Sequence, residues 1–235
     1  MKYTVYPEVF ELDDNICFGI IIGRGLAVTE SSKEDQEELK VAEAEMRTRV
    51  VPEEIRSLPN VAASRAVLSK AGINPNKFTP SVEAMLKRVA KGNDLSVINA
   101  LVDLCNVISI RHGISLGGHD LKDIHHDLEV RFSRAGDRFL PFGQTSWEDV
   151  EPGELVFTAG PEVQTRKWIW RQSELGKITG ETRDVFFQLQ GFAGNAALEL
   201  AMSDLKKLVE ERFGGSTEVF LVDRETPSID FAYQG

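Results

Sequence analysis

Hydrophobic and polar residues alternate along several parts of the chain, and this pattern predicts β-strands. Residues 2–10 and 16–23 alternate or run apolar, and the turn signal Asp13-Asp14-Asn15 separates them, so we expect a strand pair there. Beyond residue 113 a period of two dominates, which is typical of strands exposed on one face. The strands expected in this part are residues 128–134, 154–159, 163–170, 184–190 and 218–223.

A helical period of 3.6 residues marks the segments between the two groups of strands. Ser32 is placed to cap an acidic helix that ends before Pro52. Its inward stripe is Leu39, Ala42, Met46 and Val50. Four further helices are expected over residues 61–70, from Thr79-Pro80 to Gly92, over residues 96–111 and over residues 196–213. Strands, then helices, then strands predict an α+β fold, a mixed β-sheet flanked by helices.

Length and composition favour one domain over residues 1–235. The chain has 235 residues, 42% of them hydrophobic, which suffices for one large core. We expect N-terminal strands and the acidic helix in residues 1–60, a core in residues 61–225 and a loosely held tail in residues 226–235.

The two cysteines and the apolar segments bear on where the protein works. Cys17 and Cys105 lie in apolar runs, which predicts reduced core residues and a cytoplasmic protein. The N-terminus lacks a signal-peptide pattern, and no run approaches eighteen apolar residues. We therefore expect neither secretion nor a membrane contact.

The net charge of −10 argues against broad nucleic-acid binding, because affinity for phosphates comes mainly from Lys and Arg. The charges are unevenly spread: residues 30–54 hold nine acidic and four basic side chains. Residues 56–91 hold seven basic side chains against Glu83 alone. Solvated helix faces would explain this pattern, and so would an RNA-facing basic side.

Residues 98–121 carry the most informative motif. A helical pattern that contains Asn106 is followed by Gly117-Gly118-His119-Asp120, which is typical of a turn. Glycine backbone approaches a ligand closely, and an amide offers both a donor and an acceptor, so the motif suits a small polar ligand. A second polar motif follows, Arg171-Gln172-Ser173-Glu174 with Glu181-Thr182.

Together these motifs resemble the B3/B4 editing domain of the bacterial phenylalanyl-tRNA synthetase β-subunit, here as a free-standing protein. The likeness covers about residues 78–189. Residues 101–106, LVDLCN, are similar to the family's VVDVTN-type helix, with Asn106 at the pocket asparagine and Cys105 in place of the threonine. The family's pocket histidine falls at Gly117, and this chain has His119 two positions later. Glu174 followed by Glu181-Thr182 is similar to the family's E-x6-E-T run.

The resemblance implies hydrolysis of the ester between an amino acid and tRNA, with aminoacylated tRNA as partner and with no metal or cofactor. It implies His119 and Glu174 as catalytic residues. The substrate-binding residues it implies are Asn106, Gly117, Gly118, Arg171, Gln172 and Ser173. The basic stretch suggests Arg65, Lys77, Lys87 and Arg88 as tRNA contacts. The sequence leaves the oligomeric state open.

Each assignment has a structural alternative. Asn106 could bond to a backbone carbonyl, the glycine pair could be only a tight turn, and Glu174 could belong to a surface ion pair. His119 could be a satisfied or surface histidine. The alternative function is a non-catalytic module of the same fold that binds tRNA, another RNA or an amino acid, because fold does not establish activity.

Three other features carry weaker signals. Gly23-Arg24-Gly25 follows a strand but lacks the third glycine of a dinucleotide-binding loop. His125-His126-Asp127 would suit a metal-dependent phosphohydrolase, yet a strand-like segment begins directly after it. Trp168 and Trp170 share one face of an expected strand, where they could stack on a base or pack in the sheet core.

Overall fold

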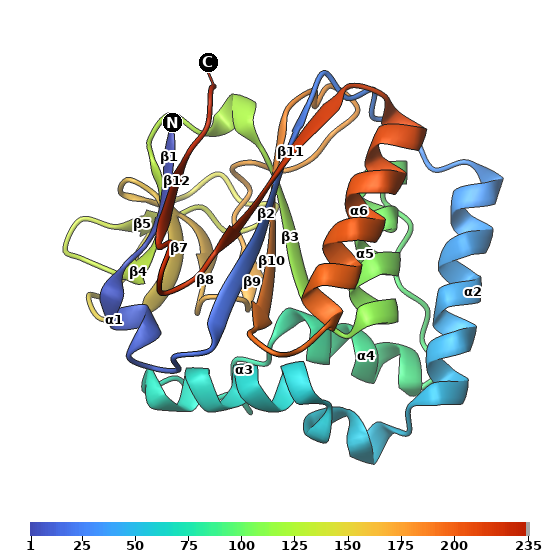
Figure 1. The fold of residues 1–235 in the computed structure, drawn as a ribbon, viewed down its shortest axis with the longest axis horizontal. Coiled ribbons are helices and arrows are strands. Elements are labelled where there is room, and N and C mark those ends of the chain that lie inside the picture. The colour runs from blue at the N-terminus through green and yellow to red at the C-terminus, as the bar shows by residue number, and fades with distance from the viewer. Residues whose placement is uncertain (234–235) are drawn as a thin grey trace.

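The computed structural model describes residues 1–233, in which two β-sheets and a set of helices form successive layers. Figure 1 shows sheet A, then sheet B, then helices α5 and α6, with α2 outermost and α3 and α4 across one end. The helices are α1 Pro7–Phe10, α2 Lys33–Arg49, α3 Pro59–Lys70, α4 Ser81–Ala90, α5 Ala100–His112 and α6 Ala197–Phe213. The expected α+β class with a mixed sheet and flanking helices is confirmed, although the strands divide into two sheets.

Sheet A is mixed. Its strands are β1 Lys2–Val5, β4 Leu128–Phe132, β5 Arg138–Phe139, β6 Glu148–Asp149, β7 Leu155–Ala159, β8 Glu162–Arg166, β9 Arg171–Gln172 and β12 Ser228–Asp230. The order is β12-β1-β4-β7-β8-β5-β6, with β9 paired to β8. The β1–β4 and β5–β8 pairs are parallel and the others antiparallel.

Sheet B is antiparallel. Its strands are β2 Ile16–Arg24, β3 Ser115–Asp120, β10 Val185–Phe192 and β11 Ser216–Val222, in the order β11-β2-β10-β3. Strand β3 therefore lies at an edge of the sheet with β10 as its neighbour, and Gly117 stands opposite Gln188. This edge positions the candidate site.

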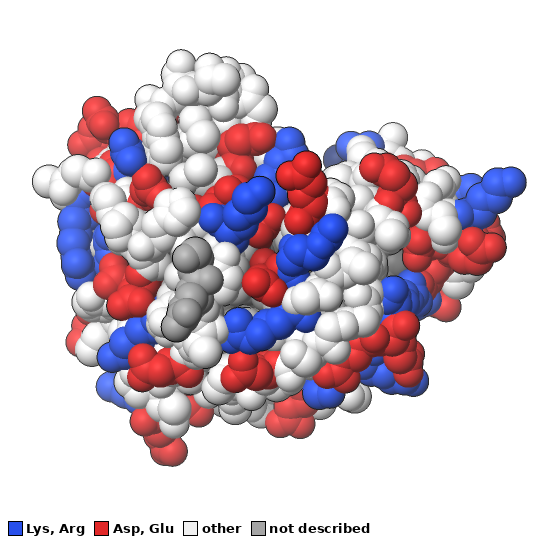
Figure 2. Space-filling view, turned by 90° about the horizontal axis from the view of Figure 1, so that it is seen from above, with Lys and Arg blue, Asp and Glu red and all other residues white. Residues whose placement is uncertain are grey.

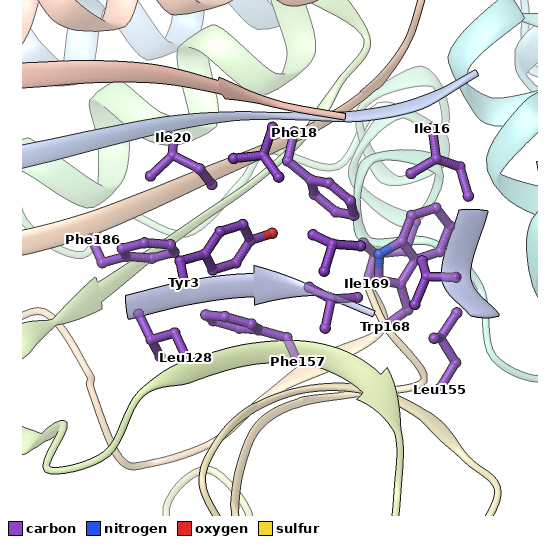
Figure 3. Packing of buried hydrophobic residues seen from close by; sticks show 14 of the residues in the cluster. Tyr3, Ile16, Phe18, Ile20, Leu128, Leu155, Phe157, Trp168, Ile169 and Phe186 are labelled. Atoms are coloured by element: carbon purple, nitrogen blue, oxygen red, sulfur yellow. The ribbon is translucent and has the colours of Figure 1, made fainter. Parts of the chain in front are cut away.

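Three apolar clusters hold the layers together. The largest lies between the sheets, where Figure 3 shows the rings of Tyr3, Phe18, Phe157 and Phe186 packed between strands, with Trp168 at the end of the cluster. The second joins sheet B to α5 and α6. The third joins α2, α4 and α5. Because both faces of sheet B are covered, β10 is buried along its whole length. Strand β7 is buried as well, so the expected exposure of one face is wrong for these two strands.

Helix ends follow the local capping signals. The Ser32 hydroxyl accepts a hydrogen bond from the Asp35 N–H, and the Asp35 carboxylate accepts one from the Ser32 N–H. This capping box starts α2 as expected. Leu39, Ala42 and Met46 are buried on its inner face, which confirms the expected stripe. The expected start of the next-to-last helix at residue 96 is wrong, because Asn99 caps α5 by accepting from the Val102 N–H. Gly113, at φ 63°, closes α5 as expected.

The prediction that the two N-terminal strands pair with each other is wrong. Pro7 starts the one-turn helix α1, so β1 ends at Val5. Strands β1 and β2 then enter different sheets.

The expected tail is also wrong for the residues described. Strand β12 pairs with β1, and Phe231 is buried in the core between the sheets. The last two positions, 234 and 235, lie outside the described residues.

Cys17 and Cys105 are buried and free, as expected. Burial raises the pKa of the Cys17 thiol to about 11 and that of the Cys105 thiol to about 12. Both are therefore protonated core residues at pH 7. None of the helices in residues 1–233 is both long and apolar enough to span a bilayer.

Candidate functional site

The Gly-Gly-His-Asp motif forms part of strand β3, so the expected turn is wrong. Pairing with β10 over residues 115–120 imposes an extended backbone on the two glycines. Successive side chains of a strand point to opposite faces. Residues 115, 117 and 119 therefore face one side of sheet B and residues 116, 118 and 120 the other.

On the first side lies a hollow of about 90 Å³, which we call the glutamine pocket. Its residues come from β3, β10, the start of α4 and the segment 165–172. They are Ser81, Ser115, Leu116, Gly117, His119, Thr165, Trp168, Ile169, Trp170, Gln172, Gln188 and Gln190. The lining mixes polar and apolar side chains and contains no Asp, Glu, Lys or Arg.

On the second side lies a hollow of about 200 Å³ against α5, which we call the Asn106 pocket. Its lining is mainly apolar, with two amides and an ammonium. The residues are Ile98, Val102, Cys105, Asn106, Leu116, Gly118, Phe142, Gln172, Lys177 and Ile178. Leu116 and Gln172 line both pockets, so the two hollows share one rim along the edge of β3.

The open edge of β3 directs backbone groups toward this rim. Gln172 Nε2 donates to the Gly118 carbonyl at 3.0 Å, and the Asp120 N–H donates to the Gly176 carbonyl at 2.8 Å. Both contacts lie outside the β3–β10 ladder. Since backbone polar groups alternate in direction along an antiparallel strand, the N–H groups of Leu116 and Gly118 also point away from β10.

Space, rather than backbone angle, restricts both positions: it is tight for a side chain at Gly117 and too small for one at Gly118. A Cβ at Gly117 would lie 3.3 Å from His119 Nε2, inside the glutamine pocket, and a Cβ at Gly118 would lie 2.7 Å from Ile178 Cδ1. The absence of side chains therefore keeps the two hollows open and lets residue 178 approach β3.

His119 is buried in the wall of the glutamine pocket. Its ring packs edge-on against Phe157, with centroids 5.0 Å apart, and its Nδ1 lies 3.5 Å from Gln172 Nε2. Burial lowers the pKa of His119 to about 3, so the imidazole is neutral at pH 7. A neutral imidazole offers one donor and one acceptor.

Glu174 lines neither pocket. Its Oε2 accepts from the Gly143 N–H at 2.8 Å, and its Oε1 lies 3.1 Å from Lys177 Nζ. The hydrogen bond from the Gly143 N–H, and to a smaller extent the contact with Lys177, holds the pKa of Glu174 below its usual value. Lys177 in turn lies 5.1 Å from the ring centre of Phe142. Glu174 therefore ties Lys177 to the backbone directly after Phe142, and both Lys177 and Phe142 line the Asn106 pocket.

The neighbours of Glu174 differ in their positions. Gln172 stands at the shared rim, whereas Arg171 is exposed on the short strand β9. Ser173 is fully buried, with its hydroxyl bonded to the Leu140 carbonyl at 3.0 Å. The structure thus brings Asn106, Gly118 and Gln172 together in one pocket, and Gly117, His119 and Gln172 in the other.

The basic stretch is partly engaged within the fold. Arg65 and Lys87 contact the buried carboxylate of Glu83 at 2.9 and 2.5 Å, and Arg56 lies 3.5 Å from it. Lys77 and Arg88 are exposed. On the face shown in Figure 2, Lys and Arg side chains are interspersed with Asp and Glu.

Sequence reasoning missed Gln188 and Gln190 as pocket residues. They alternate within the apolar run of β10, and two glutamines in a strand buried on both faces are the signal that could have drawn attention to them. Ser81 and Ser115 were also missed, because a helix start and a strand start carry serine for many reasons.

The weaker signals resolve into packing contacts. The Gly25 N–H donates to Asp184 Oδ1 at 2.9 Å, and Arg24 pairs with Glu218. Residues 167–170 form a turn rather than the end of a strand, with Lys167 and Trp168 at φ 50° and 66°. Trp168 is fully buried, and Trp170 packs edge-on against Phe78. Across residues 1–233, no three His, Cys, Asp or Glu side chains lie close enough together to hold a metal ion.

Comparisons with known proteins agree with the motif match. The family described as the B3/4 domain matches residues 63–213 of this chain. Among solved structures, an N-terminal fragment of the phenylalanyl-tRNA synthetase β-subunit from Pyrococcus horikoshii is similar over 92% of this chain, with 12% identity and a TM-score of 0.48. The chain spans 50% of that fragment. No curated protein matches the sequence.

Proposed function

Because the chain belongs to the B3/4 domain family, we propose that it is a trans-editing enzyme that hydrolyses the ester bond of mischarged aminoacyl-tRNA. The observation that carries the proposal is the open edge of β3, which directs a Gly118 N–H to a rim flanked by Asn106 and Gln172. A hollow beside a backbone donor is what such a hydrolysis requires.

Hydrolysis of an aminoacyl ester requires few functional groups from the protein. An aminoacyl ester is already activated, so the site must hold the carbonyl, place a water for attack and stabilise the oxyanion. In our proposal the Gly118 N–H faces the developing oxyanion. Asn106 holds the polar groups of the amino acid, or the attacking water, through its amide.

His119 and Glu174 fit positioning roles better than direct proton transfer. A neutral imidazole with a pKa of about 3 is a weak base at pH 7, and it lies behind Gln172. Glu174 is held by Lys177 and the Gly143 N–H at the mouth of the Asn106 pocket. We propose that His119 and Gln172 set the rim, and that Glu174 sets the position of Phe142 and Lys177.

For tRNA contact, the exposed Lys77 and Arg88 remain the proposed phosphate partners from the basic stretch. Arg65 and Lys87 are assigned to the Glu83 cluster, where they support α3 and α4. Exposed Arg171 on β9 is a further proposed contact with the substrate.

The test is deacylation across a panel of mischarged tRNAs. Asn106→Ala should lower kcat/KM at least about tenfold on the preferred substrate, because an amide contact with the reacting ester is lost. Glu174→Ala should act mainly on KM through the mouth of the pocket. Glu211→Gln, on the exposed face of α6, is the matched control and should leave both constants unchanged. Absence of turnover on every tRNA would exclude the enzyme.

A second candidate function is a non-catalytic module that binds tRNA or an amino acid. It is favoured by the same facts about His119 and Glu174, since His119 is a weak base at pH 7 and Glu174 pairs with Lys177 and lines neither pocket. Saturable binding of aminoacyl-tRNA without release of the amino acid would support this function over hydrolysis.

A further inference from the structure

The glutamine pocket carries chemistry that the proposed hydrolysis does not use. Among the described residues that line it, there is no Asp, Glu, Lys or Arg. Transferring an unpaired charge into such surroundings costs several kcal/mol or more. The pocket therefore disfavours charged ligand groups and favours uncharged ones.

Its floor is Gly117, and His119 Nε2 is the nearest atom to the space that a side chain there would fill. Gln188 stands directly opposite on β10, and Ser115 and His119 flank Gly117 on β3. Because a Cβ on residue 117 would come within 3.3 Å of His119 Nε2, the glycine leaves a gap that His119 faces.

Among the described residues that line this pocket, Gln188 and Trp168 each have a buried polar atom without a hydrogen-bond partner, and Gln188 supplies the acceptor. Only 7% of Gln188 is exposed, and within residues 1–233 its Oε1 has no hydrogen-bond partner. By contrast, the amide of Gln190 is used on both sides: its oxygen accepts from Ser64 at 3.0 Å and its nitrogen donates to the Gly191 carbonyl. A buried acceptor without a partner is costly unless a ligand or water supplies the donor.

We infer that the glutamine pocket binds a carboxamide group, whose NH2 donates to Gln188 Oε1 and whose carbonyl accepts from the neutral imidazole of His119 or the hydroxyl of Ser115. The volume agrees with this group. A hollow of about 90 Å³ has room for a group of this size. The ligand is then the side chain of asparagine or glutamine.

The carboxamide could belong to a free amino acid or to the aminoacyl ester of a tRNA. The second source rests on the proposed function, and the first does not. The shared rim makes the second source reasonable, because Leu116 and Gln172 border both pockets and Gly118 lines the Asn106 pocket next to them. A side chain in the glutamine pocket would leave its own carbonyl near this donor.

The experiment measures binding, so that it is independent of turnover. The full chain is titrated by calorimetry with L-asparagine and L-glutamine, and with their isosteric acids L-aspartate and L-glutamate. We expect one of the amides to bind at least about tenfold more tightly than its own acid, because the acid brings a charge and loses the donor to Gln188. L-leucine should also bind at least tenfold more weakly. Equal affinity for amide and acid, or no binding of either amide, would overturn the inference.

Two variants tie the binding to this pocket. Gln188→Leu removes the acceptor at similar volume and should reduce amide binding about tenfold or more. Gly117→Ala fills the floor and should do the same, which keeps the test valid if Gln188→Leu misfolds. Gly180→Ala is the control, since Gly180 has open space around its Cβ position. Amide binding that survives both pocket variants would place the ligand elsewhere.

A non-hydrolysable 3′-amide analogue of the aminoacylated terminal adenosine separates the two sources. Tighter binding of the asparaginyl or glutaminyl analogue than of the free amino acid assigns the pocket to the tRNA-linked substrate. Comparable binding assigns it to the free amino acid. Because neither result requires hydrolysis, a failure of the proposed enzyme activity leaves the carboxamide site testable.

Discussion

At the scale of single residues, the site combines groups whose chemistry depends on burial. His119 would titrate near pH 6.5 in solvent, but in the pocket wall its pKa is lowered to about 3. Asn106 and Gln172 keep the same hydrogen-bonding capacity at every pH. The uncharged state of the rim is therefore a property of how sheet B is packed.

The buried imidazole predicts a particular dependence of stability on pH. Between pH 6.5 and about 3 the unfolded chain binds a proton at His119 and the folded chain does not, so the free energy of unfolding rises with pH across this window. The slope from this residue should approach about 1.4 kcal/mol per pH unit in the middle of the window. Above pH 6.5 the contribution should vanish.

Urea unfolding of the wild type and of His119→Asn at pH 4.5, 5.5 and 6.5 measures this contribution as a difference. The carboxylates titrate in both proteins and cancel. Parallel pH profiles would mean that the imidazole is solvated or charged in the folded state.

At the scale of elements, the helices were predictable and the edge strand was not. Helix ends depend on local groups, as Ser32 and Gly113 show, so the sequence places α2 and the end of α5 within a few residues. Strand β3 contains Gly117-Gly118, which favours turns locally. Its extended form comes from pairing with β10, some seventy residues away in the chain, and no local pattern reports that contact.

The pairing of β3 with β10 also divides the candidate site into two pockets. From the sequence, Asn106, Gly117 and His119 were expected around one hollow. Once residues 115–120 form a strand, Gly117 and His119 must face away from Gly118 and α5. The residue types were therefore predictable, and their division between two pockets required the register of the strand.

The turn at Lys167 and Trp168 predicts a second result at this scale. Both residues have positive φ, which side chains other than glycine adopt at a cost. Glu154 holds the turn: it accepts from Arg166 Nε at 2.9 Å, from the Lys167 N–H at 3.0 Å and from Lys167 Nζ. Burial alone would raise the pKa of Glu154, but these donors hold that pKa below its usual value.

Glu154→Gln should lower the free energy of unfolding by about 2–3 kcal/mol, because two cations lose their partner and the turn loses its anchor. Urea unfolding followed by tryptophan fluorescence measures the loss, since Trp168 lies in the turn. Glu211→Gln, in an exposed pair with Lys207, should change stability by less than about 0.5 kcal/mol. Similar losses in both variants would show that the turn is held by packing alone.

At the scale of the whole molecule, sheets A and B share their largest core. Tyr3 from sheet A packs against Phe18 and Phe186 from sheet B, with ring centres 6.3 and 5.3 Å apart. We therefore predict one cooperative unfolding transition for the chain.

The chain offers two independent probes of that transition. Trp147, Trp168 and Trp170 adjoin strands of sheet A along the chain, with Trp168 in the core between the sheets, whereas helices α2, α5 and α6 lie beyond sheet B. Tryptophan fluorescence and far-ultraviolet circular dichroism should give the same urea midpoint. Separate midpoints would mean that the helical layer unfolds on its own.

The charge distribution predicts how tRNA binding responds to salt, if the proposed function holds. With a net charge of −10 and three cations of the basic stretch gathered around Glu83, few positive side chains remain for phosphates. If the protein makes about two to four phosphate contacts, the logarithm of the association constant for tRNA should fall with the logarithm of the salt concentration with a slope of roughly −1.5 to −3.5. Filter binding of aminoacyl-tRNA at salt concentrations from about 50 to about 200 mM measures this slope. Lys77→Ala and Arg88→Ala should each make it shallower by about 1, whereas Lys207→Ala on α6 should not. A slope steeper than about −6 would require a broad basic surface, which the mixed charges of Figure 2 do not provide on that face.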